Sequence, residues 1–308
     1  MKRSSNKEES PNKSAKREKE ISTRNTHKYS FKNSYREFST STGYQQHHAI
    51  SLNTTNQLLA VYVVYRTTIN IYTTDGYLVT IFKVVGDTFL SMYKSFIGLH
   101  FSDHMIVYSC VNSSSDGLIR INDYNIRHVQ LLELGCIECD GNNIYLANKT
   151  YLHDTSIDIL SHDVEFIRKF EAYSGYPIAI KVRGDDMIML DAISLVRKIA
   201  NKFRLIDKRL IQILEYSLSS EQLIRTIKLN TEAMPFPTYL CFDQFHNLLI
   251  GNDSSKEFAI LYRGGRISYR KMNQKDPIVR FAGLEVTDKL ELIRLEKYTG
   301  RIRIYKSK

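Results

Sequence analysis

The chain has 308 residues, of which 43% are hydrophobic and 11% aromatic, so it is long enough to bury the core of one large domain or two small ones. It contains 20 Tyr, 14 Gly, 5 Pro, 4 Cys and no Trp, a composition that excludes collagen-like fibres and small disulfide scaffolds. The formal net charge is +10, and residues 1–40 carry 11 Lys and Arg against 5 Asp and Glu, so most of the basic excess belongs to the N-terminus.

Residues 1–33 are rich in Lys, Ser, Asn and Glu and almost free of aliphatic side chains. Such a segment cannot bury enough apolar surface to offset its conformational entropy, so we expect a disordered basic tail. It lacks the apolar stretch of a secretory signal, and no apolar run approaches the roughly 18 residues of a membrane-spanning helix. With few cysteines, this favours an intracellular protein, cytoplasmic or nuclear. The run KSAKREKE can be read as a nuclear address, an RNA-contacting arm or a solvating tail, and its interspersed Glu residues favour the last.

From residue 49 onward the sequence repeats one phrase with variation. A strand of alternating polarity ends near a polar residue, a turn and a more apolar strand follow, and two further strands complete the unit. Six such units begin at Ala49, Ile97, Ile137, Ala179, Tyr239 and Gly283. Equivalent residues in successive units are 50, 38, 56, 46 and 43 positions apart. Four short strands per period of about 40–50 residues predict the blades of a β-propeller.

The fourth strand of each unit is expected to form the outer edge of its blade. Basic residues recur in these strands at Lys83, Arg127, Lys169, Arg225 and Arg270. Charged side chains on an edge strand hinder pairing with other chains, so this role is sufficient to explain them.

The last unit ends the chain as YTGRIRIYKSK and has only three strands. An incomplete blade would leave the ring open, and the segment SYREFSTSTG at 34–43 stands just before the first inner strand. We therefore predict that Tyr35 to Phe38 pair with the RIRIY strand and supply the missing fourth strand. The predicted fold is an all-β, six-bladed β-propeller over residues 34–308, with its last blade closed by an N-terminal strand.

The blade phrase resembles that of the NHL-repeat family of six-bladed propellers. The resemblance is carried by CFDQFHNLLIGNDSSKEFAILYRGGRI at 241–267 and by ECDGNNIYLAN at 138–148. The absence of Trp separates the chain from WD-repeat propellers and from sialidase-type Asp boxes. The resemblance implies a rigid platform that binds partners through its loops, and some NHL-type propellers bind single-stranded RNA on a basic face.

Residues 192–212 form an insertion that no other unit has. On a helical wheel the apolar residues of this insertion form one stripe, although Leu205 and Asp207 break the segregation, so we predict a basic amphipathic helix. The predicted binding residues are Arg197, Lys198, Lys202, Arg204, Lys208 and Arg209. Such a helix can bind an acidic protein, an anionic membrane or RNA phosphates. Alternatively, the insertion can be a helix or a hairpin that packs its apolar stripe on the propeller and leaves its basic residues in solvent.

A second candidate surface lies in the last two units, where Tyr and basic residues interleave. Its predicted contact residues are Tyr262, Arg263 and Arg266. Stacking on aromatic rings combined with phosphate contacts is the usual way to hold single-stranded RNA. Alternation along a strand places Tyr262 and Arg263 on different faces, however, and protection of the edge strand explains the basic residues equally well.

Three patterns that could serve catalysis or bind a metal have simpler explanations. CIEC at 136–139 is a single Cys pair whose members point to opposite faces of a strand, which indicates buried Cys rather than a zinc site. The His pair in QQHH at 45–48 divides between two faces in the same way. Asp140, Asp243 and Asp288 recur near the ends of inner strands, where propeller lactonases hold a divalent cation, but Asp is also the usual turn residue there.

We therefore predict no catalytic residue, no metal site and no cofactor, and we expect a monomeric, non-enzymatic interaction scaffold. Its partner is expected to be a protein, bound through propeller loops and the 192–212 insertion. The alternatives are an RNA-binding NHL-type propeller that uses a basic face, and a metal-dependent hydrolase or lyase that uses the central channel.

Overall fold

The computed structural model describes residues 34–40, 47–53, 56–63, 68–83, 95–101, 106–111, 116–122, 125–131, 134–140, 142–149, 155–161, 163, 165–172, 177–193, 196–199, 202–205, 210–253, 257–272 and 280–306. The predicted tail, residues 1–33, lies outside these ranges. Within them, no helix is long and apolar enough to cross a membrane.

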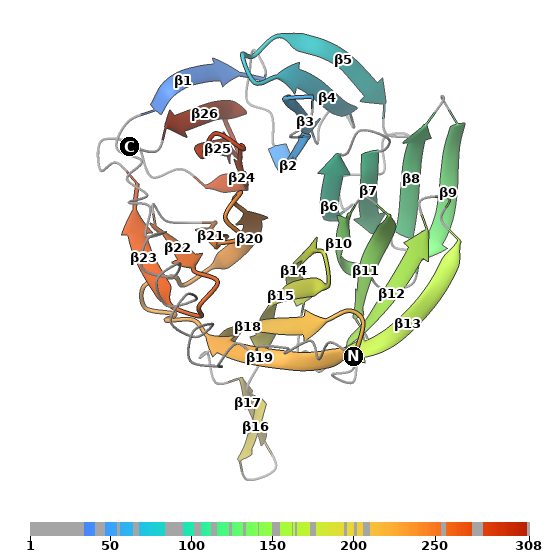
Figure 1. Cartoon of the computed structure of the whole chain (residues 1–308), viewed down its shortest axis with the longest axis vertical. Helices are drawn as coiled ribbons and strands as arrows, with labels where there is room; N and C mark the ends of the chain where they lie inside the picture. The colour runs from blue at the N-terminus through green and yellow to red at the C-terminus, as the bar shows by residue number, and fades with distance from the viewer. Residues whose placement is uncertain are drawn as a thin grey trace, which may run out of the picture.

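Six four-stranded sheets surround a central axis (Figure 1). In each sheet the strands follow one another in chain order from the axis outward, except that the last sheet takes its outer strand from the N-terminal segment. This arrangement confirms the predicted all-β propeller.

The bounds of the strands, from the innermost to the outermost in each sheet, are as follows. The first sheet contains β2 (His47–Asn53), β3 (Leu58–Val63), β4 (Thr68–Thr73) and β5 (Leu78–Lys83). The second contains β6 (Ser95–Phe101), β7 (Ile106–Val111), β8 (Asp116–Asn122) and β9 (Asn125–Leu131). The third contains β10 (Leu134–Cys139), β11 (Asn143–Lys149), β12 (Thr155–Ser161) and β13 (Phe166–Ala172).

The fourth sheet contains β14 (Pro177–Arg183), β15 (Asp186–Ile193), β18 (Leu210–Ser217) and β19 (Gln222–Lys228). The fifth contains β20 (Pro237–Phe242), β21 (Leu248–Asn252), β22 (Glu257–Leu261) and β23 (Ile267–Lys271). The sixth contains β24 (Phe281–Val286), β25 (Glu291–Glu296), β26 (Arg301–Lys306) and β1 (Ser34–Ser39).

Every innermost strand carries the same irregularity near its start. In β14, for example, the register shifts between Pro177 and Ala179, and each of the other inner strands has a shift at the corresponding place. Such bulges increase the local twist of a strand. The shared shift also makes the residues that follow it structurally equivalent in all six sheets, which matters for the axial site described below.

The N-terminal strand β1 closes the ring by pairing with β26, as predicted. Arg36 lies opposite Ile304, and Phe38 lies opposite Ile302. The Arg36 guanidinium also forms an ion pair with Asp75, in the turn between β4 and β5, and lies 3.3 Å from Oε2 of Glu291. One strand therefore connects the sixth sheet to the first.

Phe38 fixes the position of β1 against the first sheet. Its ring centroid lies 6.0 Å from that of Tyr72, whose hydroxyl donates a 2.9 Å hydrogen bond to the carbonyl of Thr40. A Cβ atom at Gly76 would lie 2.7 Å from Cγ of Phe38, and Gly76 has a φ of +94°. Only glycine provides both this backbone conformation and this space.

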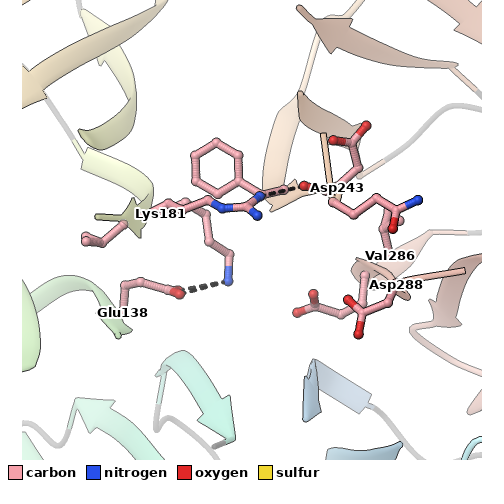
Figure 2. Close-up of a pocket in the computed structure, with 10 residues that line it drawn as sticks. Glu138, Lys181, Asp243, Val286 and Asp288 are labelled. Atoms are coloured by element: carbon pink, nitrogen blue, oxygen red, sulfur yellow. Dashed lines mark hydrogen bonds and ion pairs between the residues drawn. The ribbon is translucent and has the colours of Figure 1, made fainter. Parts of the chain in front are cut away.

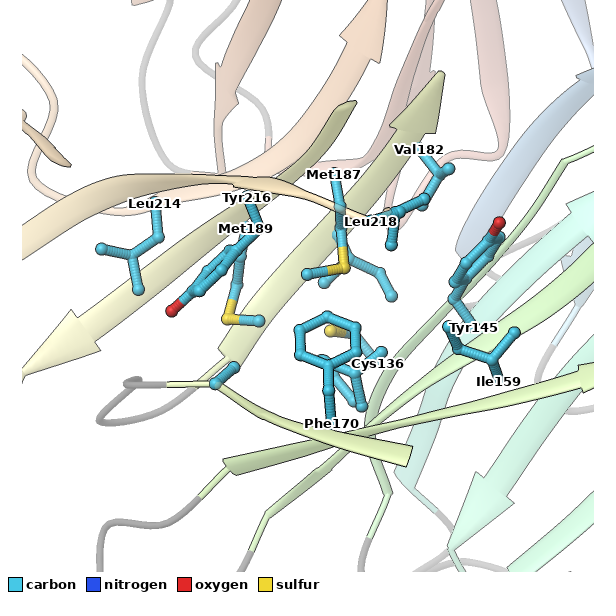
Figure 3. Packing of buried hydrophobic residues seen from close by; sticks show 14 residues of the cluster. Cys136, Tyr145, Ile159, Phe170, Val182, Met187, Met189, Leu214, Tyr216 and Leu218 are labelled. Carbon is cyan, nitrogen blue, oxygen red and sulfur yellow. The ribbon is translucent and has the colours of Figure 1, made fainter. Parts of the chain in front are cut away.

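The hydrophobic cores lie between neighbouring sheets. Figure 3 shows Cys136 and Phe170 of the third sheet packed among Met187, Met189 and Tyr216 of the fourth. Each face of a sheet is thereby covered by the next one, and burial of apolar surface provides about 25 cal/mol per Å². A ring is stable only when every face is covered in this way.

The insertion at 192–212 is not a helix. Beyond the pair formed by Ile193 and Leu210, β16 (Val196–Ile199) and β17 (Lys202–Leu205) form a hairpin that projects away from the ring (Figure 1). Of the two alternatives, the helix is wrong and the hairpin is confirmed for the described residues. Short apolar runs fit both periodicities, and β16 and β17 are extended and paired. Leu205, which broke the helical stripe, alternates with the basic residues of β17.

The closure by β1 can be tested with two truncated chains. We expect the chain without residues 1–40 to unfold at a lower temperature than the chain without residues 1–33, because only the longer deletion uncovers β26. In the full-length chain, Phe38→Ala should lower the free energy of unfolding by about 1–3 kcal/mol, less than a fully buried Phe because Phe38 is partly exposed. Circular dichroism during heating and in urea measures both effects. Equal stability of the two truncated chains would contradict the closure.

Candidate functional site

The Cys pair predicted to be structural is buried. Cys136 and Cys139 are free thiols, and burial raises the pKa of both, with a further rise from the nearby Glu138 carboxylate. They are therefore protonated and unreactive at neutral pH. Of the QQHH segment, β2 begins at His47, and the side chains of this His pair lie outside the described part.

The carboxylates at the ends of the inner strands organise turns. Asp140 accepts hydrogen bonds from the backbone N–H groups of Asn142 and Asn143, each at 2.7 Å. Asp243 accepts from Phe245 and Asn247 in the same way, each at 2.8 Å. The turn-forming explanation is confirmed for these two residues.

A cavity of 290 Å³ lies at the axis, on the side where the inner strands end in turns. It is lined by Glu138, Lys181, Val182, Arg183, Phe242, Asp243, Gln244, Glu285, Val286 and Asp288. Figure 2 shows Glu138 and Lys181 across the cavity from Val286 and Asp288. Among the described residues, no three His, Cys, Asp or Glu side chains are grouped to hold a metal ion.

A buried ion pair joins the third and fourth sheets at this cavity. Nζ of Lys181, on β14, lies 2.9 Å from Oε2 and 3.1 Å from Oε1 of Glu138, on β10. Burial alone would lower the pKa of Lys181, but the Glu138 and Glu285 carboxylates together raise it above its ordinary value. Lys181 is therefore a permanent cation and not an amine nucleophile.

Glu285 is the third charged group of this cluster and lacks a comparable partner. Burial raises its pKa to about 7, Glu138 adds to the rise, and Lys181 partly offsets it. No hydrogen-bond donor among the described residues contacts its carboxylate. Glu285 therefore gains and loses a proton close to neutral pH.

The sequence contains a pattern that predicts this cluster, but a comparison of only the polar residues at the ends of the inner strands does not reveal it. Counted from the shared register shift, Glu138, Lys181 and Glu285 occupy the same position of their inner strands. Each stands two residues before the polar residue that ends the strand. Charged residues inside inner strands, compared between repeats, would have predicted an axial site.

The structure brings together the three predicted contact residues of the fifth sheet. Arg266 lies over the Tyr262 ring, 5.0 Å from its centroid. Tyr262 and exposed Arg263 line a small cavity. Arg183 lines both this cavity and the axial one. The other polar residues of the small cavity are Asp186, Glu215, Arg225 and His246. Burial lowers the pKa of His246, and Arg183 and Arg263 lower it further. This cavity is thus rich in arginine.

The predicted basic residues of the insertion occupy a different place. Arg197 and Lys198 lie in β16, Lys202 and Arg204 lie in β17, and the projecting hairpin pairs Arg197 with Arg204. Lys208 and Arg209 lie outside the described residues.

The outer strand of the first sheet differs from the other outer strands. β5 reads LVTIFK and carries no charge before Lys83, whereas β1, β9, β13, β19 and β23 each have charged residues in their interior. Three of its apolar side chains are exposed, namely Leu78 by 51%, Val79 by 53% and Ile81 by 49%, and Tyr77, in the turn just before it, is exposed by 75%. Among the described strands β5 is the edge of its sheet, and this edge is apolar up to Lys83 at its end, the one residue of the strand that was expected to protect it.

Comparison with known proteins supports the fold and goes no further. No protein-family model and no curated protein matches the chain. Among solved structures, the β-propeller domain of Cps50 (Swd1) from Myceliophteria thermophila is similar with a TM-score of 0.58 and 12% identity, over 90% of this chain and 99% of that one. The WD40 β-propeller domain of Doa1 has a TM-score of 0.53 and 10% identity, over 85% and 79%. Virginiamycin B lyase from Staphylococcus aureus has a TM-score of 0.56 and 11% identity, over 88% and 98%.

Replacement of Glu285 tests the charge balance of the axial cavity. Because the pKa of Glu285 is raised in the folded state, its protonated form stabilises that state. This contribution to stability is complete below about pH 4.5 and is lost as the pH rises through 7. Glu285→Gln should therefore match the wild type at pH 4 and exceed its stability at pH 8.5 by on the order of 1–3 kcal/mol. Urea unfolding between pH 4 and 9 measures the difference. The exposed Glu165→Gln is the control, and parallel stability profiles for all three proteins would contradict the assignment.

Proposed function

We propose that this protein is a non-enzymatic interaction scaffold, a six-bladed propeller of the NHL-like type, that binds a protein partner through the edge of β5. The observation that carries this proposal is the exposure of Leu78, Val79 and Ile81 on an edge strand that has no charged residue before Lys83.

An edge strand offers a row of backbone N–H and C=O groups to an incoming strand. Soluble proteins usually block such edges with charges, because an open edge recruits other chains. β5 instead exposes apolar side chains on both faces, since Leu78 and Val79 are neighbours in an alternating strand. An extended, apolar segment of a partner can add to such an edge by backbone pairing, with side-chain contacts providing specificity.

The projecting hairpin supports a second contact with the partner. β16 and β17 together carry four basic residues and no acidic one, namely Arg197, Lys198, Lys202 and Arg204. This charge complements an acidic surface, so we propose that the hairpin contacts an acidic patch of the partner.

The state of the axial groups favours binding over catalysis. Burial raises the pKa of the Cys139 and Cys241 thiols, and the neighbouring carboxylates keep Lys181 protonated. Each of these nucleophilic side chains is thus held in its unreactive form.

The edge of β5 can be tested by adding charge to it. The Val79→Lys/Ile81→Lys double variant should lose at least tenfold in affinity for proteins that the immobilised wild type retains, because two ammonium groups oppose an apolar strand. Thr226→Lys, at an exposed position of the outer strand β19, is the matched control and should retain the same proteins. Quantitative mass spectrometry of the retained proteins measures the three chains side by side. Identical sets of partners for all three would contradict the proposal.

RNA binding is the second candidate, because Tyr262, Arg263 and Arg266 form one arginine-rich, aromatic group. If this group binds single-stranded RNA, the affinity for a labelled oligonucleotide should fall steeply between 50 and roughly 200 mM salt. The Arg263→Ala/Arg266→Ala double variant should reduce the slope of log affinity against log salt by up to the equivalent of about two phosphate contacts. A flat salt dependence would end this alternative, and nuclease treatment of the pull-down separates it from protein binding.

A further inference from the structure

The axial cavity has three properties that together indicate a ligand. It is large enough for a small organic group, with a volume of 290 Å³. Its walls combine the apolar side chains of Val182, Phe242 and Val286 with ionisable residues from the inner strands, or the turns that follow them, of four different sheets. It also contains more carboxyl groups than cations, namely Glu138, Asp243, Glu285 and Asp288 against Lys181 and Arg183.

The pairing of these groups shows where the excess negative charge lies. Glu138 is neutralised by Lys181 through the 2.9 Å ion pair. Asp288 is close enough to Arg183 to oppose the lowering of its pKa, while the Arg183 guanidinium donates a 2.6 Å hydrogen bond to the carbonyl of Asp243. Two carboxyl groups have no cation of their own. That of Asp243 accepts hydrogen bonds from Phe245 and Asn247, whereas Glu285 has only the attraction of the already paired Lys181.

We propose that the axial cavity binds a monovalent organic cation, an ammonium or guanidinium group on a short apolar stem, with Glu285 as its counter-ion. The stem would lie against Val182, Val286 and Phe242, and the charged head would provide the hydrogen-bond donors that Glu285 lacks among the described residues.

An anion is disfavoured because the cations of the cavity are already engaged. An anionic ligand would have to displace Glu138 from Lys181 or the Asp243 carbonyl from Arg183, and it would face Glu285 and Asp288. A neutral ligand would leave Glu285 as a buried charge without a partner, which is costly in a low-dielectric site.

The cation can come from two sources, a free small molecule or the Lys or Arg side chain of a polypeptide. The second source rests on the proposed function, since the cavity would then receive one side chain of the same partner. Both share the same chemistry, and the two arms of the experiment separate them.

Binding should depend on pH, because a proton and the cation compete for Glu285. The groups that face Glu285 are Lys181 from β14, Glu138 from β10 and the Cys241 thiol from β20, of which Lys181 and Cys241 do not titrate near neutrality. With a pKa of about 7, Glu285 is almost entirely protonated at pH 5.5 and ionised at pH 8.5, so the apparent affinity should rise about thirtyfold between them.

The test uses the full-length protein and titration calorimetry at both pH values. In the first arm the probe is n-butylguanidinium, with the neutral n-butylurea as its matched control. In the second arm the probe is the capped tripeptide Gly-Arg-Gly, with Gly-citrulline-Gly as its control. Each probe is measured with the wild type, with Glu285→Gln, with Asp288→Asn and with the exposed control Glu165→Gln.

The expected result is binding of at least one charged probe at pH 8.5, at least tenfold tighter than its neutral control, lost in Glu285→Gln and kept in Glu165→Gln. Asp288→Asn, at an exposed position of the turn between β24 and β25, should weaken binding severalfold. Binding of n-butylguanidinium alone supports a free ligand, and preference for the tripeptide supports a side chain. Equal binding of charged and neutral probes, or undiminished binding by Glu285→Gln, overturns the proposal. The β5 double variant should still bind the probe, so a failure of the β5 surface and a failure of the cavity remain distinguishable.

Discussion

Closure of the ring is the constraint on which the rest of this structure depends. Each sheet buries its faces against its neighbours, so one open junction would expose two apolar surfaces at once. The junction between the first and sixth sheets is made by residues from opposite ends of the chain, with Phe38 packed above Gly76 and Ile50 packed against Gly283. A Cβ atom at Gly283 would lie 2.3 Å from Cγ2 of Ile50, so the contact there is as close as backbone and side chain allow. This junction combines hydrogen bonds, apolar packing and the ion pairs of Arg36.

Closure of the ring also determines which side chains meet at the axis. Once the ring forms, the inner strands converge, and side chains at equivalent positions are forced into a small volume whatever their charge. Lys181 and Glu138 therefore meet at 2.9 Å although 43 residues separate them in the chain. Buried ion pairs contribute little to stability when compared with apolar packing. Their presence here, together with the incompletely matched Glu285, is more readily explained by a ligand than by the demands of the fold.

The parts of the structure that local pattern controls could be predicted from the sequence. Strand and turn periodicity identified the propeller, and the three-stranded last repeat identified the pairing of Arg36 and Phe38 with β26. The sequence left a helix and a hairpin open for the insertion because its short apolar runs fit both periodicities, and the pairing of β16 with β17 decides between them. The axial site was missed because it depends on which residues share a register position, and this position follows from the bulge before Ala179 and its equivalents. Tyr262, Arg263 and Arg266 were predicted as contact residues, but strand alternation does not separate Tyr262 from Arg263, because both lie between β22 and β23. Arg183 of β14 and His246, from the turn between β20 and β21, join them at the same cavity.

An ion pair connects the closing strand β1 to the turn that precedes the edge strand β5. Arg36 forms its ion pair with Asp75, which lies in the turn that leads into β5, so the position of this edge depends on the presence of β1. A partner that adds a strand to β5 would therefore bind the closed ring better than an open one. Because coupling between two binding events is reciprocal, such a partner would stabilise the pairing of β1 with β26 by the same free energy with which closure strengthens the binding of the partner. If a partner binds this edge, as proposed, its binding and the closure of the ring would therefore support each other.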